Sequence, residues 1–348
     1  MKLPAMGKVP PYVFRKLILP HLGAPDKNIV VGPRHGVDCG VVAVEGTDKV
    51  LVIETDPFYI ARELGMKLAS WFAVHILASD VAVMGARPKY LAVDLNLPLE
   101  TRERELEEMW LAVHSECKRL GISIVSGHTA RYPGCNYPMV GGAVMIGITT
   151  RDKFITPGGA RIGDDIIITK GAAIEATALL ATFFEKKVRA KLGDEIAQKA
   201  KALAWKMSVV EEALTAIDAG GRGIHSMHDA TECGVYGALY EVASASGVGM
   251  VVEKEKIMVR DEVRRVCEFF KIDPYISISE GTLLITCAPE KTDEILRALK
   301  KKKIDASRVG KVVEKKRGMR LVVGRRETRL THPREDPFWR ACSGKTIE

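Results

Sequence analysis

The sequence predicts an α+β protein of two domains. Three observations carry this prediction: a strand-rich first half that contains two helices, a glycine- and proline-rich stretch near the middle, and a second α+β succession after it. The chain has 348 residues, of which 47% are hydrophobic and 28% are charged. This composition provides enough apolar side chains for two packed cores and argues against a disordered chain.

The first half predicts a mostly antiparallel sheet with helices on one face. A long apolar helix over 59–84 is followed by a strand, Tyr90 to Leu97, whose strict alternation places Leu91, Val93, Leu95 and Leu97 on one face. A second helix runs from Thr101 to Gly121 with an apolar stripe. The remaining expected strands cover 28–31, 40–44, 49–54, 122–125 and 139–148. The order β-β-β-α-β-α-β-β is typical of an α+β layer domain.

Two stretches divide the chain. Residues 1–27 are rich in proline and glycine and predict an arm with one short helix around Val13 to Leu19. Glycine, proline and charged residues cluster again over 150–165, where we place the domain boundary. The expected domains are 1–153, with the arm, and 154–348.

The second half repeats the α+β character. Helices are expected in three stretches up to Ala219, in one up to Ser246 and over 291–301. The expected strands cover 165–169, 224–227, 250–252, 282–286, 308–313 and 319–323.

The first candidate functional residue is Asp80, which lies inside the apolar helix just before Gly85 and Pro88 end it. An unpaired carboxylate in such a place costs several kcal/mol. Asp80 must therefore cap a turn, pair with a cation or hold a metal.

Two further aspartates stand at comparable places: Asp38 in a glycine loop, and Asp56 at a strand end before Pro57. Carboxylates gathered at one edge of a domain repel each other unless cations lie between them, and magnesium with nucleotide phosphates requires such oxygen ligands. The strand-to-loop turn expected at 126–129 would bring His128 to the same edge, although a histidine satisfied within its own loop is the alternative.

Composition excludes several other classes of protein. The seven cysteines form no CxxC pair, which indicates reduced thiols, a cytoplasmic location and no zinc ribbon. No signal peptide is visible, and Lys67, His75 and Asp80 interrupt the most apolar window, so no membrane span is expected. Of the net charge of +8, residues 291–334 carry a local +11 without any aromatic residue. A solvated face typical of heat-adapted proteins is therefore favoured over nucleic-acid binding.

The sequence contains neither of the two commonest phosphate-binding motifs. Gly344-Lys345-Thr346 ends like a P-loop, but Trp339 stands where the first glycine is required. No GxGxxG follows a strand either.

Several segments resemble one family in the right order. GVDCG with Asp38, TD with Asp56, SDVAVMGARP with Asp80 and SGHTA are similar to signatures of the superfamily of aminoimidazole ribonucleotide (AIR) synthase, the hydrogenase maturation factor HypE, thiamine-monophosphate kinase and selenophosphate synthetase. GDDIIITKGAAIEATALLA, MHDATECGVYGALYEVASASGVGM and SISEGTLLIT resemble the second-domain motifs. The similarity spans roughly 27–324, and archaeal HypE-like proteins look closest.

The resemblance implies a fold, cofactors and site residues. It implies an AIR synthase-like fold whose N-terminal ferredoxin-like sheets pair in a homodimer as a shared barrel, with ATP and Mg²⁺ at its edge. Asp38, Asp56 and Asp80 would then be ligands of magnesium and the phosphate edge. The glycine turns with Gly85 and the SGHTA segment with Gly127, His128 and Thr129 would lie beside the phosphates. Asp229 and Glu232 would face the acceptor from the second domain, although a helix-capping role explains Asp229 equally well.

The same resemblance leaves two functions open. One is an ATP-dependent enzyme of the HypE/AIR synthase type that activates an oxygen of a small-molecule or carbamoyl-type acceptor. The other is a nucleotide-binding partner in metallocentre assembly with weakened turnover, or an enzyme of the purine or thiamine branch. HypE proper ends in a carbamoyl-carrying cysteine, whereas here six residues follow Cys342; Val37 and His128 also stand where the family often has acids.

Overall fold

The computed structural model describes residues 11–34, 36–135 and 139–344. Its first domain is built on a six-stranded sheet with the strand order β1-β2-β3-β6-β4-β5. Only the pair β4 and β5 is parallel within this sheet, so the predicted, mostly antiparallel arrangement is confirmed. The strands are β1 (Ile29–Val31), β2 (Gly40–Ala43), β3 (Lys49–Tyr59), β4 (Arg87–Leu97), β5 (Ser123–Arg131) and β6 (Met139–Thr150).

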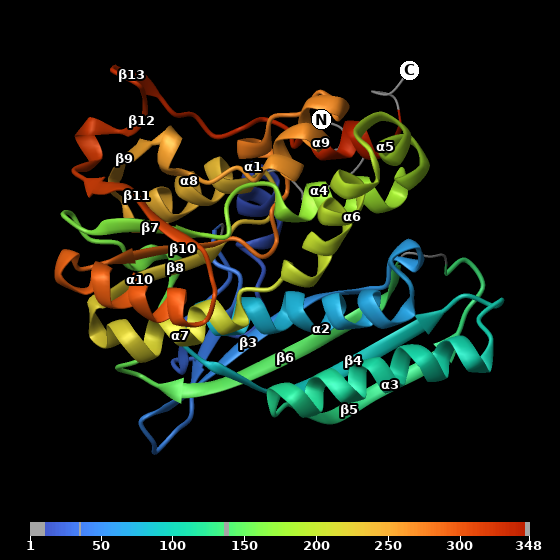
Figure 1. Ribbon diagram of the computed structural model, residues 1–348. Coiled ribbons are helices and arrows are strands. Elements are labelled where there is room, and N and C mark those ends of the chain that lie inside the picture. The colour runs from blue at the N-terminus through green and yellow to red at the C-terminus, as the bar shows by residue number, and fades with distance from the viewer. Residues whose placement is uncertain (1–10, 35, 136–138, 345–348) are drawn as a thin grey trace.

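Helices α2 (Met66–Val83) and α3 (Glu103–Leu120) cover one face of this sheet (Figure 1). The alternating residues Leu91, Val93, Leu95 and Leu97 of β4 are all buried, as predicted. Strict alternation places one row of side chains on the helix-covered face, and their burial removes apolar surface from water. Gly121 ends α3 in the left-handed conformation, with φ of 73°.

Helix α2 is the central helix of the molecule. It packs against α3 and the sheet on one side and against α7 (Val210–Gly220) and β8 (Ile224–Asp229) of the second domain on the other. In the described part of the chain it is the one helix long and apolar enough to cross a membrane by length and composition, and most of it is buried inside the protein. It begins at Met66 rather than Tyr59, because β3 continues to Tyr59 and Gly65 turns the chain with φ of 76°.

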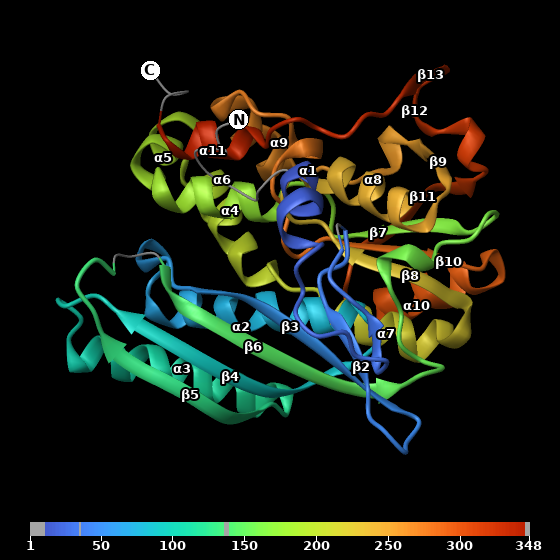
Figure 2. The same cartoon turned by 180° about the vertical axis from the view of Figure 1, so that it is seen from behind.

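The opposite face of the first sheet carries no helix of the described residues (Figure 2). Leu51, Ile53 and Ile146 point to this face and are half-buried, and Ile148 is exposed. A sheet face of this kind needs a cover, because contiguous apolar surface is rarely left to solvent.

The second domain contains a seven-stranded sheet with the order β13-β12-β9-β11-β7-β10-β8. The pair β12 and β9 is parallel, and the other pairs are antiparallel. Its other strands are β7 (Asp165–Thr169), β9 (Gly249–Glu253), β10 (Leu283–Cys287), β11 (Ala306–Val313), β12 (Met319–Val323) and β13 (Arg326–Arg329). Its other helices are α4 (Ile174–Phe183), α5 (Glu185–Leu192), α6 (Asp194–Ala202), α8 (Gly234–Ser246), α9 (Asp261–Phe270), α10 (Thr292–Lys301) and α11 (Pro337–Cys342).

Two local predictions were wrong, and one alternative is excluded. The segment Ser126–Thr129 is not a turn but the middle of β5, because parallel pairing with β4 extends the strand to Arg131. Asp56 lies within β3, which pairs with β6 over its whole length, rather than after a strand end. Asp229 does not cap a helix: it ends β8, and α8 begins at Gly234.

The remaining predictions concern the arm, the thiols and the C-terminus. The arm contains α1 (Pro11–Val13) and a π-helical turn (Phe14–Ile18), while residues 1–10 lie outside the described part. All seven cysteines are free, and five of them are buried. Lys345 and Thr346, which resemble a P-loop end, lie outside the described residues.

Candidate functional site

An acidic cleft of about 590 Å³ lies between the two domains. Its first-domain wall contains Asp38 before β2, Asp56 on β3 and Asp80 in the last turn of α2. The second domain contributes Asp229 and Glu232. The structure thus brings five of the predicted site residues to one cavity. Further lining residues include Phe14, Arg34, Glu54, Phe72, Ile76, Glu175, Glu241, Ile278, Glu280 and Trp339.

Asp80 is buried because the helix that carries it is packed on two sides. Burial raises its pKa well above the ordinary range, and the charges of Asp229 and Glu54 raise it further. The buried thiol of Cys39 donates a hydrogen bond to the backbone carbonyl of Asp80, at 3.2 Å, and ties the loop before β2 to the end of α2. Within the described part of the chain, Asp80 therefore faces other acids and forms no ion pair with a lysine or arginine.

Asp229 is the most buried acid of the second-domain wall, with 1% of its surface exposed. Neither of its side-chain oxygens has a hydrogen-bond partner with good geometry among the described residues. Burial raises its pKa, and the charge of Asp38 adds to the shift. Glu280 is also buried, and burial together with Asp229 raises its pKa well above the usual range. Such groups are costly in a folded protein unless a ligand compensates them.

His228 joins the two walls of the cleft. Its Nδ1 lies 3.1 Å from Oδ2 of Asp38 and 3.6 Å from Oδ1 of Asp229, and its Nε2 lies 3.0 Å from Oε2 of Glu241. Burial alone would lower the pKa of this histidine, but the carboxylates of Asp38 and Glu241 outweigh burial and raise it well above the ordinary value. Asp38, His228 and Asp229 each offer one ligand atom within 4.8 Å of the others.

Glu54 is a further acid of the cleft, and the sequence analysis did not predict it. Only 4% of it is exposed, and burial together with Asp38 and Asp56 raises its pKa to about 8. The signal was present in the alternation of β3, where Val50, Val52 and Glu54 share the buried face.

The chemistry of the donor set fits a hard divalent cation with phosphate groups. Among the lining residues of the described chain, Arg34 is the sole lysine or arginine, whereas carboxylates come from both domains. Magnesium prefers carboxylate oxygens and phosphate oxygens as ligands, and its charge lowers the pKa of nearby acids. A bound divalent cation would therefore favour the ionised forms of Asp80, Asp229 and Glu280, whose pKa values burial raises.

The other predicted site residues lie away from this cavity. Gly85 turns the chain after α2 with φ of 78°, and a Cβ there would lie 2.8 Å from the carbonyl oxygen of Lys153. Gly127, His128 and Thr129 are on β5, at the edge of the sheet opposite to β1. Within one chain, His128 stacks on Tyr132, and its Nε2 lies 3.0 Å from the hydroxyl oxygen of that tyrosine. Contact of these residues with phosphates stays a prediction.

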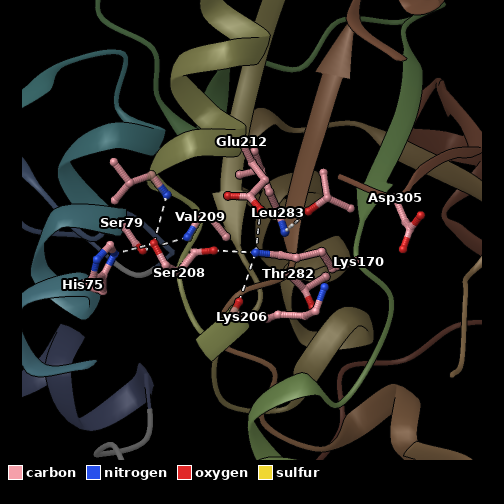
Figure 3. A network of polar contacts seen from close by, with 12 residues as sticks. His75, Ser79, Lys170, Lys206, Ser208, Val209, Glu212, Thr282, Leu283 and Asp305 are labelled. Atoms are coloured by element: carbon pink, nitrogen blue, oxygen red, sulfur yellow. Dashed lines mark hydrogen bonds and ion pairs between the residues drawn. The ribbon is translucent and has the colours of Figure 1, made fainter. Parts of the chain in front are cut away.

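A polar network on another side of α2 holds the two domains together (Figure 3). The backbone N–H of Val209 donates to Oγ of Ser79 at 3.0 Å, and Nδ1 of His75 lies 2.5 Å from Oγ of Ser208. Lys170 is buried and places its Nζ 2.6 Å from Glu212, donating to the carbonyl oxygen of Ser208 as well. These contacts fix α2, and with it Asp80, relative to the second-domain wall.

Comparison with known proteins identifies the family. The profile of the AIR synthase related protein, N-terminal domain, matches residues 36–149, and that of the C-terminal domain matches residues 161–322. The chain belongs to the AIR synthase-related family.

Members of this family with assigned names resemble the chain over much of its length. It is 26% identical to a putative hydrogenase expression/formation protein of Methanocaldococcus jannaschii, over 97% of this chain and 98% of that protein. It is 30% identical to carbamoyl dehydratase HypE of Cupriavidus necator, over 70% of this chain and 67% of HypE.

Solved structures of HypE share the fold. HypE in a HypE–HypF complex superposes with a TM-score of 0.70 at 19% identity, covering 84% of this chain and 93% of that one. HypE in complex with ATP superposes with a TM-score of 0.65 at 21% identity, covering 96% and 97%. The two-domain AIR synthase-like α+β fold predicted from the sequence is therefore confirmed, apart from its dimeric barrel.

Proposed function

We propose that this HypE-like chain binds Mg²⁺–ATP in the acidic cleft and transfers the γ-phosphoryl group to an oxygen of a carbamoyl-type or other small-molecule acceptor. The observation that carries the proposal is the convergence of Asp38, Asp80 and Asp229, from three separate segments, in one cleft whose described lining contains a single arginine. HypE has been solved with ATP, and the Cupriavidus necator relative is a carbamoyl dehydratase. Both facts support the same function for this chain.

Each wall of the cleft has a role in this proposal. Asp38, Asp56 and Asp80 hold the cation, which neutralises phosphate charge when it is bound. Asp229, Glu232 and Glu280 face the acceptor from the second domain and accept hydrogen bonds from its N–H or O–H groups. The acceptor oxygen takes the phosphoryl group, ADP leaves, and the phosphorylated oxygen becomes a leaving group.

The uncovered sheet face supports a homodimer. Pairing the open faces of two first-domain sheets would bury the row that contains Leu51, Ile53 and Ile148 and form the barrel that the family resemblance implies. It offers a route by which β5 of a second copy, with Gly127, His128 and Thr129, comes to an ATP site. Light scattering at micromolar concentration should give twice the 38.2 kDa of one chain, and a mass near one chain would contradict the barrel.

A second function is favoured by specific differences. Val37 and His128 stand where acids are common in the family. These features favour a nucleotide-binding assembly partner with weakened turnover, acting with a maturation protein as HypE does in the HypE–HypF complex.

Magnesium-dependent ADP release by the purified protein separates the two functions. We expect ADP release in the presence of an acceptor such as carbamoyl phosphate, and none after chelation of magnesium. Binding of ATP without release, across carbamoyl, purine and thiamine acceptors, would favour the assembly partner.

A further inference from the structure

The C-terminal segment 336–342 reaches the cleft although it lies far from the other cleft residues in sequence. Helix α11 packs against α4, as Figure 2 shows, and buries Phe338 and Ala341 in the second-domain core. Trp339, on the same short helix, lines the acidic cleft. The segment is thus anchored by its apolar side chains and presents an indole ring to the cavity.

Asp336 fastens this segment to a loop that carries the cleft acids. The side chain is fully buried, with 0% of the residue exposed. Its Oδ2 accepts a hydrogen bond from the backbone N–H of Cys233 at 2.7 Å, and its Oδ1 accepts one from the backbone N–H of Phe338 at 2.9 Å. A backbone hydrogen bond from Ile278 also reaches this carboxylate. Cys233 directly follows Glu232, and Ile278 lies two residues before Glu280, so one side chain connects both acidic loops to the tail.

Trp339 also connects the C-terminal segment to the loop that carries Glu232. Its Nε1 donates a hydrogen bond to Oε1 of Glu232 at 3.2 Å, which orients that carboxylate at the cleft wall. Phe338 contacts Trp339 edge-to-face, with ring centroids 5.3 Å apart, and holds the indole ring. The cleft therefore has an aromatic side chain beside an oriented acid.

We propose that the C-terminal segment completes the ligand site: Trp339 is the aromatic surface on which the bound ligand packs, and Asp336 is a positioning residue that holds the Glu232 and Glu280 loops against it. The proposal rests on the proposed function for the identity of the ligand, Mg²⁺–ATP with its acceptor. An aromatic surface next to carboxylates suits a planar group that carries N–H donors, because the ring covers its face while Glu232 accepts from its edge.

The test uses the full chain with the variants Trp339→Ala, Trp339→Phe and Asp336→Asn, and with Trp205→Phe as a matched control. Trp205 is 49% exposed and packs edge-to-face on Trp71, and it does not line the cleft. Calorimetry measures the affinity for Mg²⁺–ATP and, in its presence, for carbamoyl phosphate as the acceptor. Intrinsic fluorescence reports the surroundings of the Trp339 ring. We expect Trp339→Ala to weaken binding about tenfold and Trp339→Phe less than threefold. The ATP-dependent change in emission should disappear in Trp339→Phe and persist in Trp205→Phe.

The role of Asp336 is tested without nucleotide by hydrogen exchange. An asparagine offers one acceptor oxygen where the carboxylate offers two, so the backbone N–H groups of Cys233 and Phe338 can no longer both be satisfied by it. Faster exchange is expected at 231–234 and 277–280 in Asp336→Asn, with β9 unchanged. Unchanged exchange there overturns the positioning role.

The remaining outcomes separate this proposal from the proposed function. Wild-type affinity in Trp339→Ala, with an emission change that survives in Trp339→Phe, overturns the contact with the ligand. If the wild-type chain binds no Mg²⁺–ATP, the proposed function and this ligand contact both fail, and the exchange measurement still decides the role of Asp336.

Discussion

Replacing Glu116 by glutamine should destabilise the protein at neutral pH and much less in acid. Glu116 lies on α3, and its Oε1 accepts a hydrogen bond from Nε2 of His75 at 2.6 Å, while Nε of Arg119 donates to it at 2.9 Å. Through His75, which also contacts Ser208, the carboxylate connects α3, α2 and the second domain. The substitution keeps the shape of the side chain and removes its charge.

The size of the expected stability loss follows from the pKa of Glu116. Burial alone would raise the pKa of Glu116, but the hydrogen bonds from His75 and Arg119 outweigh burial and lower it from 4.5 to about 2. At ~1.4 kcal/mol for each pKa unit, the ionised side chain contributes about 3 kcal/mol at pH 7. Because the folded-state pKa is lowered, this contribution is complete above the unfolded-state pKa and is lost as the pH falls towards 2. About 1 kcal/mol remains at pH 3.

Urea unfolding at pH 7 and pH 3 measures this difference. Glu116→Gln should lose about 3 kcal/mol at pH 7 and about 1 kcal/mol at pH 3 relative to the wild type. Glu107→Gln, an exposed change on the same helix, should stay near zero at both pH values. An equal loss at the two pH values in Glu116→Gln would refute the reasoning, because the charge would then not be the source of the stability.

Three further changes test other parts of the structure. Lys170→Met leaves the buried Glu212 without its cation and should cost about 3 to 5 kcal/mol in urea unfolding. Lys199→Met, in an exposed pair, should leave the urea midpoint nearly unchanged. Equal losses would mean that burial does not matter. Gly85→Ala places a Cβ 2.8 Å from a backbone oxygen at a positive φ and should lower the melting temperature more than Gly46→Ala, which has a positive φ and open space; a smaller loss would contradict the close packing. Cys342 is half-buried in α11, and burial raises its thiol pKa, so incubation with ATP, carbamoyl phosphate and the carbamoyl-transfer partner should add no mass in intact mass spectrometry. A gain that disappears in Cys342→Ala would identify it as a carrier.

The first-domain architecture was predictable because its signals are local. The alternation in β4 and the largely apolar sequence of α2 indicate burial directly, so the sheet and helices could be placed from periodicity. The unusual position of Asp80 was visible for the same reason, since a carboxylate inside an apolar helix departs from the pattern around it.

The other features of the site depend on contacts between residues that are distant in sequence. His228 becomes a bridge only because β8 pairs with β10 and ends opposite the loop of Asp38. The extension of β5 through His128 depends on parallel pairing with β4, and no local sequence pattern predicts this pairing. The hydrogen bonds of the buried Asp336 carboxylate likewise join three separate segments, because they come from Phe338 in the tail, from Cys233 and from Ile278.

Glu54 is a different case, because its signal was present and was not used. Its position in the alternation of β3 predicts an inward side chain, and an inward glutamate beside two aspartates is itself an indication of a cation site. Alternation should therefore be read for polar residues as well as for apolar ones.

Calorimetric titration of Mg²⁺–ATP into the wild type and Asp80→Ala tests the central claim most directly. The wild type should bind, and Asp80→Ala should retain its fold by circular dichroism and lose at least tenfold in affinity, because a cation ligand is removed. Glu107→Ala, which removes an exposed carboxylate from α3 outside the cleft, should bind as the wild type does. Equal affinity in the wild type and Asp80→Ala would contradict the assignment of the acidic cleft as the nucleotide site.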